Sequence, residues 1–394
     1  MNHAPSSTSY EVVIVGSGPA GASAALGLAA AGVKVAVLER ASLPRHKTCG
    51  GGVVQRALRL LPLNIRAAVE RDCFVAEMNL PDIGLHFETR RQDPIIAMTM
   101  REKFDYLLLS AAKEAGACIQ PSCKVLDVFP QSERVELITS IGPLSARFVV
   151  AADGAVSTVA RKMNWPDNRR LIPALEYEVF VGDNLLERFS RSARFDVGVV
   201  PYGYGWVFPK KDHLSIGILT MRSDLTNLNE RFEPYLRFLG IPSTLRMERH
   251  GALIPVTTRS GPFASGRIIL TGDAAGFVDP VTCEGITFAI QSGQIAARSL
   301  IGGNMRAEAV SFAYDNEIAA KILPELNAAR RLATLLHDFP KLRGIFFHLY
   351  GRGFTEAVTD IMTGGRTYRG VISNPANYFK LLNLWGHGRS SCTA

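Results

Sequence analysis

Short apolar runs along the chain predict a set of buried strands. They share apolar residues at nearly every position: Val12–Val15, Val33–Leu38, Arg147–Ala151 and Gly266–Thr271. Between the first two runs, the Ala- and Leu-rich segment Ala22–Ala31 predicts a helix that ends at Gly32. Strands that are apolar on both faces are typical of a parallel sheet covered by helices. The pattern therefore predicts an α/β unit with a parallel sheet.

A different pattern occupies residues 165–262, where apolar and polar positions alternate over short segments. This alternation predicts an antiparallel sheet from the segments ALEYEVFV, SARFDVGVV, GWVFP and HLSIGIL. Residues 73–98 also predict short strands, whereas 53–71, 306–339 and 342–363 have helical spacing. The remaining expected elements are the strands Ala117–Val128 and Glu133–Thr139 and the helices Phe104–Gly116 and Thr287–Ile301.

Composition narrows the class of protein. Hydrophobic residues make up 47% and charged residues 20% of the 394, which is typical of a globular protein. No apolar run approaches the roughly 20 residues of a membrane span, and Met1–Ser9 lacks the apolar core of a secretory signal. We therefore expect a cytoplasmic protein. Its six cysteines show no C-x-x-C pair and no metal-ligand spacing, so we expect free thiols and no metal.

The chain carries a net charge of +8, but no nucleic-acid-binding module or long basic run accompanies it. A solvated basic surface explains such a charge most simply. The C-terminal segments GIFFHLYGRGF and NYFKLLNLWGHGR mix aromatic and basic residues. They favour ordinary helix packing, with peripheral contact with the inner face of a membrane as the alternative.

The first strand leads into a G-x-G-x-x-G turn formed by Gly16, Gly18, Pro19, Ala20 and Gly21. The first glycine permits the tight turn, the second lets a pyrophosphate approach the backbone, and the third lets the helix pack against the strand. The second strand ends at Glu39, an acid placed to accept hydrogen bonds from a ribose. The combination predicts a Rossmann-like site for FAD or NAD.

Two later turns also place an acid beside a glycine at the end of a predicted strand. These pairs are Asp153-Gly154 and Gly272-Asp273. Carboxyl ends of parallel strands are where such sheets bind ligands. The peptide N–H groups near Gly285 and Ile286 begin the next helix and are expected to face a flavin carbonyl.

A third glycine-rich segment, Cys49-Gly50-Gly51-Gly52, follows the second strand. Three consecutive glycines weaken any helix or strand interior, so they indicate backbone pressed against something flat, such as a flavin ring. The alternative is a flexible loop with an incidental cysteine.

Aromatic side chains recur at every second position from Tyr202 to Phe208, within the segment PYGYGWVFPKK. In an extended chain these side chains point to one face. Such a face suits a long apolar ligand or, as the alternative, an ordinary sheet core.

The three acid–glycine elements together resemble the FAD-dependent oxidoreductases that include para-hydroxybenzoate hydroxylase. That resemblance implies an FAD site that also uses Arg101, Arg40 and Val125, and it associates Asp153-Gly154 with FAD and NADPH. The segments KTCGGG, PYGYGWVFPK and GDAAGFVDPVTCEGI resemble the geranylgeranyl reductase family more closely. The family's chlorophyll branch usually continues CGGAIP, whereas this chain reads CGGGVV, which argues against a pigment substrate.

The resemblance implies three parts. An FAD-binding domain would comprise 1–71, 99–164 and 263–305. A substrate-binding sheet domain would comprise 72–98 and 165–262. The segment 306–394 would form a C-terminal helical region. Overall the chain would be α+β, with the Rossmann-like domain interleaved with the antiparallel sheet.

The implied activity is saturation of carbon–carbon double bonds in a prenyl chain, with NADPH or another reductant as electron donor. Hydride and a proton must reach the two alkene carbons in a dry tunnel. Cys49 and Tyr204 are the candidate catalytic residues; Tyr204, Trp206 and Phe208 would line the tunnel. Lys210, Lys47 and Arg45 would meet a diphosphate. Two alternatives remain at this point: an FAD-dependent aromatic monooxygenase that uses NAD(P)H and oxygen, and a non-catalytic prenyl-lipid carrier.

Overall fold

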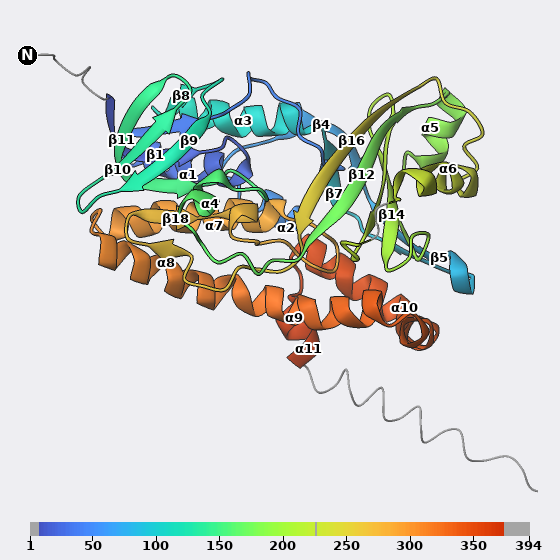
Figure 1. Ribbon diagram of the computed structural model, residues 1–394. Coiled ribbons are helices and arrows are strands. Elements are labelled where there is room, and N and C mark those ends of the chain that lie inside the picture. The colour runs from blue at the N-terminus through green and yellow to red at the C-terminus, as the bar shows by residue number, and fades with distance from the viewer. Residues whose placement is uncertain (1–7, 225–226, 374–394) are drawn as a thin grey trace, which may run out of the picture.

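The computed structural model describes residues 8–224 and 227–373. The segment NYFKLLNLWGHGR, and with it the end of the expected helical region 306–394, lies outside this part of the chain. The described residues form two large sheets, one small sheet and a row of C-terminal helices (Figure 1). Among these helices, none combines the length and apolar character needed to cross a membrane.

The first sheet is built around strand β1 (Thr8–Val15), which pairs in parallel with a strand on either side. Its path continues outward to the edge strands, and a β-hairpin extends from β11. The other strands are β2 (Val35–Leu38), β8 (Cys118–Gln120), β9 (Val125–Pro130), β10 (Val135–Thr139), β11 (Gly142–Ala151), β17 (Ala264–Ser265) and β18 (Ile268–Leu270). The predicted run Ala117–Val128 is therefore two strands rather than one. The parallel core confirms the predicted Rossmann-like unit.

Register aligns the carboxyl ends of the parallel strands. Val15 stands opposite both Leu38 and Ala151, and Ala151 stands opposite Leu270. The turns that follow these strands therefore meet at one edge of the sheet, as the sequence predicts. Helix α1 (Pro19–Ala30) packs against both α3 (Arg101–Glu114) and α7 (Ile286–Gly302), and the short α4 (Thr158–Lys162) follows β11.

The second sheet has seven strands and occupies the opposite end of the molecule (Figure 1). Its pairs are antiparallel except β13–β5, which is parallel, so the sheet is mixed rather than purely antiparallel. In spatial order the strands are β16 (Arg246–Pro255), β12 (Leu171–Phe180), β15 (Leu214–Thr220), β14 (Gly203–Pro209), β13 (Ser192–Val197), β5 (Val75–Leu80) and β6 (Leu85–Arg90). Two helices that the pattern did not predict, α5 (Asp183–Phe189) and α6 (Asn229–Phe238), contribute to a separate apolar core with this sheet.

The helix expected at 53–71 is largely wrong. Its two ends instead form the strands β3 (Gly52–Val54) and β4 (Val69–Cys73). Both pair with β7 (Ile96–Thr99), the middle strand of a three-stranded sheet. Between them lie only the four-residue α2 (Gln55–Leu58) and the turn η1 (Arg66–Ala68). Pro62 explains the failure, because a proline and the residue before it both resist helical geometry. A further short turn, η2 (Pro81–Ile83), links β5 to β6.

The C-terminal segment is helical, as predicted, and runs beneath both sheets (Figure 1). It consists of α8 (Ala307–Lys321), α9 (Leu323–Ala333), the π-helical turn η4 (Thr334–Asp338), α10 (Pro340–Thr363) and α11 (Tyr368–Ser373). Buried residues of η4 and α10 join the second sheet in one hydrophobic core. The C-terminal helices therefore close the lower side of the space between the sheets.

Candidate active site

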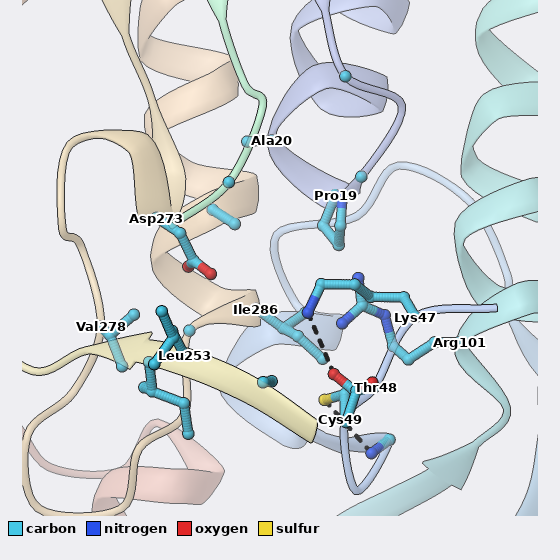
Figure 2. A pocket seen from close by; sticks show the side chains of 18 of the residues that line it. Pro19, Ala20, Lys47, Thr48, Cys49, Arg101, Leu253, Asp273, Val278 and Ile286 are labelled. Carbon is cyan, nitrogen blue, oxygen red and sulfur yellow. Dashed lines mark hydrogen bonds between the residues drawn. The ribbon is translucent and has the colours of Figure 1, made fainter. Parts of the chain in front are cut away.

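A cavity of about 390 Å³ lies where the two sheets meet. Turns at the carboxyl edge of the first sheet line one side, and strands of the second sheet line the other. Figure 2 shows the loop residues Lys47, Thr48 and Cys49 facing Pro19 and Asp273 across this pocket, with Leu253 and Val278 on a third side. The site is therefore one continuous space shared by both halves of the molecule.

The predicted cofactor residues gather here. Those that line the cavity are Gly16, Gly18, Pro19, Ala20, Glu39, Arg40, Cys49, Gly50, Gly51, Arg101, Val125, Asp153, Gly154, Asp273, Gly285 and Ile286. Gly21 and Gly272 lie behind the lining. An added Cβ at Gly21 would meet the carbonyl oxygen of Gly16 at 1.9 Å, so this glycine allows the helix to pack closely on the strand.

The turn after β1 fits a dinucleotide. Gly16 has a φ of +103°, and an added Cβ would lie 2.4 Å from the carbonyl oxygen of Ala152. No side chain caps α1 at Gly18, so the first peptide N–H groups of the helix remain available to a ligand. The turn, the free helix end and the cavity in front of them match the needs of a pyrophosphate.

Glu39 is buried and fixed by several hydrogen bonds. Its carboxylate accepts from the backbone N–H and hydroxyl of Ser17, from the N–H of Ala41 and from the Arg45 guanidinium. Burial opposes ionisation, but the charge of Arg45 and the hydrogen bonds from Ser17 together lower the pKa of Glu39. The acid therefore stays ionised and can accept hydrogen bonds from ribose hydroxyls.

Two arginines stand beside this turn. Arg45 pairs with both Glu39 and Asp105, and Arg101 makes a two-pronged pair with Asp105. An added Cβ at Gly18 would lie 3.6 Å from the Arg45 guanidinium, so Arg45 stands beside the pyrophosphate turn. Arg45 therefore lies in the cofactor half of the cavity. The sequence analysis had instead predicted that it binds a substrate diphosphate.

The other two turns place their acids differently. Asp153 accepts hydrogen bonds from the Ser157 hydroxyl and the Val159 N–H, so its carboxylate organises the start of α4. Asp273 lines the cavity near the N-terminus of α7, where Gly285 provides no side-chain cap. Its Oδ1 would be 3.3 Å from a Cβ added at Gly285, so the acid and the helix end are neighbours. Asp273 and the start of α7 are therefore both available to a ligand in the cavity.

The triple-glycine loop is pressed against aromatic rings of the protein itself. An added Cβ at Gly50 would lie 2.8 Å from the Phe208 ring and 2.9 Å from the Trp206 indole nitrogen. At Gly51, where φ is +66°, it would lie 2.0 Å from the carbonyl oxygen of Thr99. The glycines were predicted to press against a flat group such as a flavin ring. The flat groups that Gly50 contacts are the rings of Trp206 and Phe208 in the second sheet.

Three of the four predicted aromatic residues line the cavity. Tyr204, Trp206 and Phe208 contribute to one apolar cluster on the inner face of β14. Tyr202 does not follow them, because it lies before the strand with a φ of +56° and its ring faces the guanidinium of Arg222. The alternation begins only at Gly203, where the extended chain begins.

Lys210 does not lie where the sequence analysis predicted, which was at a substrate diphosphate. It is fully buried, does not line the cavity, and donates hydrogen bonds to the carbonyl oxygens of Gly50 and Thr99. It therefore anchors the glycine loop instead of meeting a diphosphate. Lys47 lines the cavity and keeps an exposed side chain, so it remains the candidate at that end.

A second, smaller apolar pocket of about 50 Å³ adjoins the cavity. The two pockets share Phe195, Tyr204, Thr282 and Met362 in their linings. The Tyr204 hydroxyl donates to the carbonyl oxygen of Thr282 at 2.6 Å, which fixes the ring at the junction. His337, in the π-helical turn, also lines the small pocket, and burial lowers its pKa to about 4.

The sequence analysis did not predict three residues of the site. Glu176 and Cys283 line the cavity, and His337 lines the smaller pocket. Glu176 accepts a hydrogen bond from the Cys49 N–H at 2.7 Å. The signal was present in the segment ALEYEVF, where two acids interrupt an otherwise apolar strand.

Comparison with known proteins now adds a family to this geometry. The FAD binding domain family matches residues 9–195. The chloroplastic geranylgeranyl diphosphate reductase of Oryza sativa subsp. japonica is 31% identical over 76% of this chain and 68% of its own length. This chain belongs to the geranylgeranyl reductase family. It is thus an FAD-binding oxidoreductase.

Other proteins similar to this chain carry different names. The menaquinone reductase of Mycolicibacterium smegmatis is 27% identical and aligns over 84% of this chain and 85% of that protein. A geranylgeranyl bacteriochlorophyll reductase-like protein from Thermoplasma acidophilum has a TM-score of 0.76 at 22% identity, covering 96% of this chain and 97% of that chain. Flavin-dependent halogenases share the fold as well. Fold alone therefore does not select the substrate.

Proposed function

We propose that this protein uses FAD to saturate carbon–carbon double bonds of a prenyl chain attached to a diphosphate, a lipid or a quinone. The observation that carries the proposal is the continuity of the cavity. It runs from the dinucleotide turns to the aromatic face of β14, where a second apolar pocket adjoins it. A long, flexible hydrocarbon fits such a space better than a small polar aromatic compound.

The chain's own residues supply binding and orientation. Gly16, Gly18 and the start of α1 would hold the pyrophosphate, Glu39 the adenosine ribose, and Asp273 the ribityl chain. The start of α7 would face the flavin pyrimidine, where its positive end stabilises negative charge. Bound FAD, once reduced by NADPH or another electron donor, supplies the hydride for the alkene.

The second sheet would hold the substrate. Tyr204, Trp206 and Phe208 form an apolar wall that excludes water and aligns the isoprene unit. Cys49, in the loop opposite, lies beside the reacting bond in this proposal, and Lys47 meets a diphosphate where the substrate carries one. Tyr204 is a poor acid, because burial raises its pKa well above the usual value and its hydroxyl is already donated to Thr282.

We also propose that one face of α10 contacts a lipid surface. Phe339 precedes the helix, and Leu342, Ile345 and Leu349 recur at helical spacing; all four are about half exposed or more. Exposed Lys341 and Arg352 flank this stripe and suit anionic headgroups. The opposite face of α10 lines the small apolar pocket through Phe347 and Phe354, so a lipid substrate would have a short path to the cavity.

An anaerobic single-turnover experiment tests the proposed function. The purified flavoprotein is photoreduced, and geranylgeranyl diphosphate and a menaquinone are offered in turn. We expect one of them to reoxidise the flavin and to gain mass in steps of two hydrogens. Reoxidation by neither compound, together with oxygen consumption driven by NADPH and a phenol, would instead identify an aromatic monooxygenase.

A further inference from the structure

Two buried glutamates stand on the inner face of β12, beside the cavity. Glu176 and Glu178 are two positions apart in one strand, so their side chains share a face. They are only 1% and 6% exposed. Carboxylates are rarely buried so completely unless they are paired or functional.

The register of the sheet places Glu176 in line with the aromatic wall. Gly217 of β15 stands opposite both Trp206 of β14 and Glu176 of β12. A Cβ added at Gly217 would lie 2.0 Å from the Trp206 indole, so the ring extends across the glycine toward the glutamate. Glu176 therefore belongs to the same row of cavity-facing positions as Trp206, and its carboxylate reaches the N–H of Cys49.

Polar groups lie between this row of positions and solvent. The Ser215 hydroxyl donates to Glu176 at 2.6 Å and stands directly opposite Glu178 in the ladder. A Glu178 oxygen lies 2.7 Å from Nε2 of His213, whose Nδ1 lies 2.7 Å from Asp212. The Asp212 side chain is 73% exposed. The polar groups thus form two sets, Glu176 with Ser215 at the cavity wall and Glu178 with His213 and Asp212 toward solvent. The two sets adjoin where Ser215 and Glu178 stand opposite each other.

Burial and neighbouring charges shift the pKa values of the acids and bases among these polar groups. Burial and the neighbouring charge of Glu178 raise the pKa of Glu176. Burial alone would lower the pKa of His213, but its hydrogen bonds with Glu178 and Asp212 raise it. Burial lowers the pKa of Lys210, although the charges of Glu178 and Glu176 oppose that shift. His250 of β16, opposite Glu176, stacks on His46 and completes the titratable surroundings.

We propose that Glu176 is the acid that protonates the alkene, and that Ser215, Glu178 and His213 restore its proton from water at Asp212. This assignment rests on the proposed function. The O–H bond of the Glu176 carboxyl breaks as a C–H bond forms at one alkene carbon. The hydride forms the C–H bond at the other carbon, so one proton and one hydride saturate one double bond. The resulting carboxylate is then reprotonated through these groups.

Glutamine substitutions separate proton donation from anchoring. Glu176→Gln retains an oxygen that can accept from Cys49, so a purely structural role would survive it. Glu178→Gln interrupts the path one step away. Glu248→Gln is the matched control, because this acid stands opposite Glu178 in β16 but is exposed to solvent. Retention of bound FAD and the thermal unfolding midpoint check that each variant folds.

The first measurement is single-turnover reoxidation of the photoreduced protein. We expect Glu176→Gln to slow reoxidation by the prenyl substrate by about a hundredfold or more, and Glu178→Gln by about tenfold. Reoxidation by ferricyanide, which needs no proton donor at the substrate, should match the wild type in every variant. In D₂O the wild-type product should gain two solvent deuteriums per double bond, because the hydrogen on N5 of a reduced flavin also exchanges with solvent. Glu248→Gln should behave as the wild type does.

The second measurement is the infrared carbonyl-stretch band of a buried protonated carboxyl near neutral pH. We expect this band in the difference spectrum of wild type minus Glu176→Gln, because other buried acids such as Asp153 contribute equally to both spectra. A difference spectrum without the band, or an unchanged prenyl reoxidation rate, overturns the proton-donor role. If no prenyl compound reoxidises the wild type, the proposed function itself fails and this role falls with it.

Discussion

Gly51 holds the loop beside the cavity in a conformation and a space that other residues cannot share. Its φ of +66° is in the left-handed region, and its missing Cβ leaves room for the carbonyl oxygen of Thr99. The Gly51 carbonyl oxygen accepts hydrogen bonds from the backbone N–H and the hydroxyl of Thr99, and the Lys210 ammonium donates to the neighbouring Gly50 carbonyl. The position of Cys49 thus depends on contacts that only glycine permits.

We expect Gly51→Ala to destabilise the protein by more than about 3 kcal/mol and to release FAD, because left-handed strain adds to a clash with backbone. Gly84→Ala is the matched control, since Gly84 has a φ of +67° but nothing within 4 Å of an added Cβ. It should cost only about 1–2 kcal/mol and retain FAD. Denaturant unfolding and flavin absorbance measure both effects. Equal costs for the two variants would refute the packing argument.

His337 makes the fold sensitive to acid. Burial lowers its pKa from 6.5 to about 4, so the unfolded chain binds a proton that the folded protein does not between these values. Stability is therefore greatest above pH 6.5 and falls as the pH decreases toward 4, by about 2–3 kcal/mol at pH 4.5. His337→Phe, which cannot titrate, should lose less stability over this interval. Urea unfolding at pH 7 and pH 4.5 gives the comparison, and identical losses would contradict it.

At the scale of the element, strand β14 has two different faces. Trp206 faces the cavity, whereas the adjacent Val207 belongs to the separate core formed with α5 and α6. Neighbouring positions on one strand therefore test the two sides of the sheet independently.

We expect Trp206→Ala to reduce prenyl turnover at least about tenfold while FAD stays bound, because the wall that orients the isoprene unit is lost. Val207→Ala should lower the unfolding temperature and leave the Michaelis constant for the prenyl substrate unchanged. Steady-state kinetics and thermal unfolding of both variants are the measurements. Unchanged kinetics in Trp206→Ala would remove β14 from the substrate path.

The elements that the sequence predicted well are those whose signals are local. A run such as Val12–Val15 is buried on both sides whatever its partners are, and G-x-G-x-x-G demands one kind of turn. The prediction of a helix at 53–71 was wrong. The leucines of this segment are apolar because they pack against a core formed by distant residues, and Pro62 prevents a regular helix.

Long-range contacts explain what the sequence could not predict at the site. Lys210 follows the aromatic segment, but its role is decided by the carbonyls of Gly50 and Thr99, which are remote in sequence. Glu176 looks like a surface charge on a strand until the sheet register places it beside Gly217 and Trp206. Chemistry-bearing residues outside a motif acquire meaning only from the fold.

At the scale of the whole molecule, three groups of elements meet around one cavity. The first sheet presents the turns that hold the cofactor, the second presents an aromatic wall, and the C-terminal helices close the space below (Figure 1). Because α10 has one face on the apolar pocket and the other exposed, it connects the cavity with the surface of the molecule.

If the exposed face of α10 docks on lipid, replacing Leu342, Ile345 and Leu349 with glutamine should weaken binding to vesicles of phosphatidylglycerol and phosphatidylcholine by more than about tenfold. Removing even part of the burial of three leucine-sized side chains amounts to at least about 2 kcal/mol. Binding should also fall as salt is added, since basic residues flank the stripe. Phe312→Gln, which alters an exposed aromatic on α8, is the control and should bind as the wild type does. Vesicle co-sedimentation measures this, and equal binding by the triple variant would mean that the stripe meets another partner.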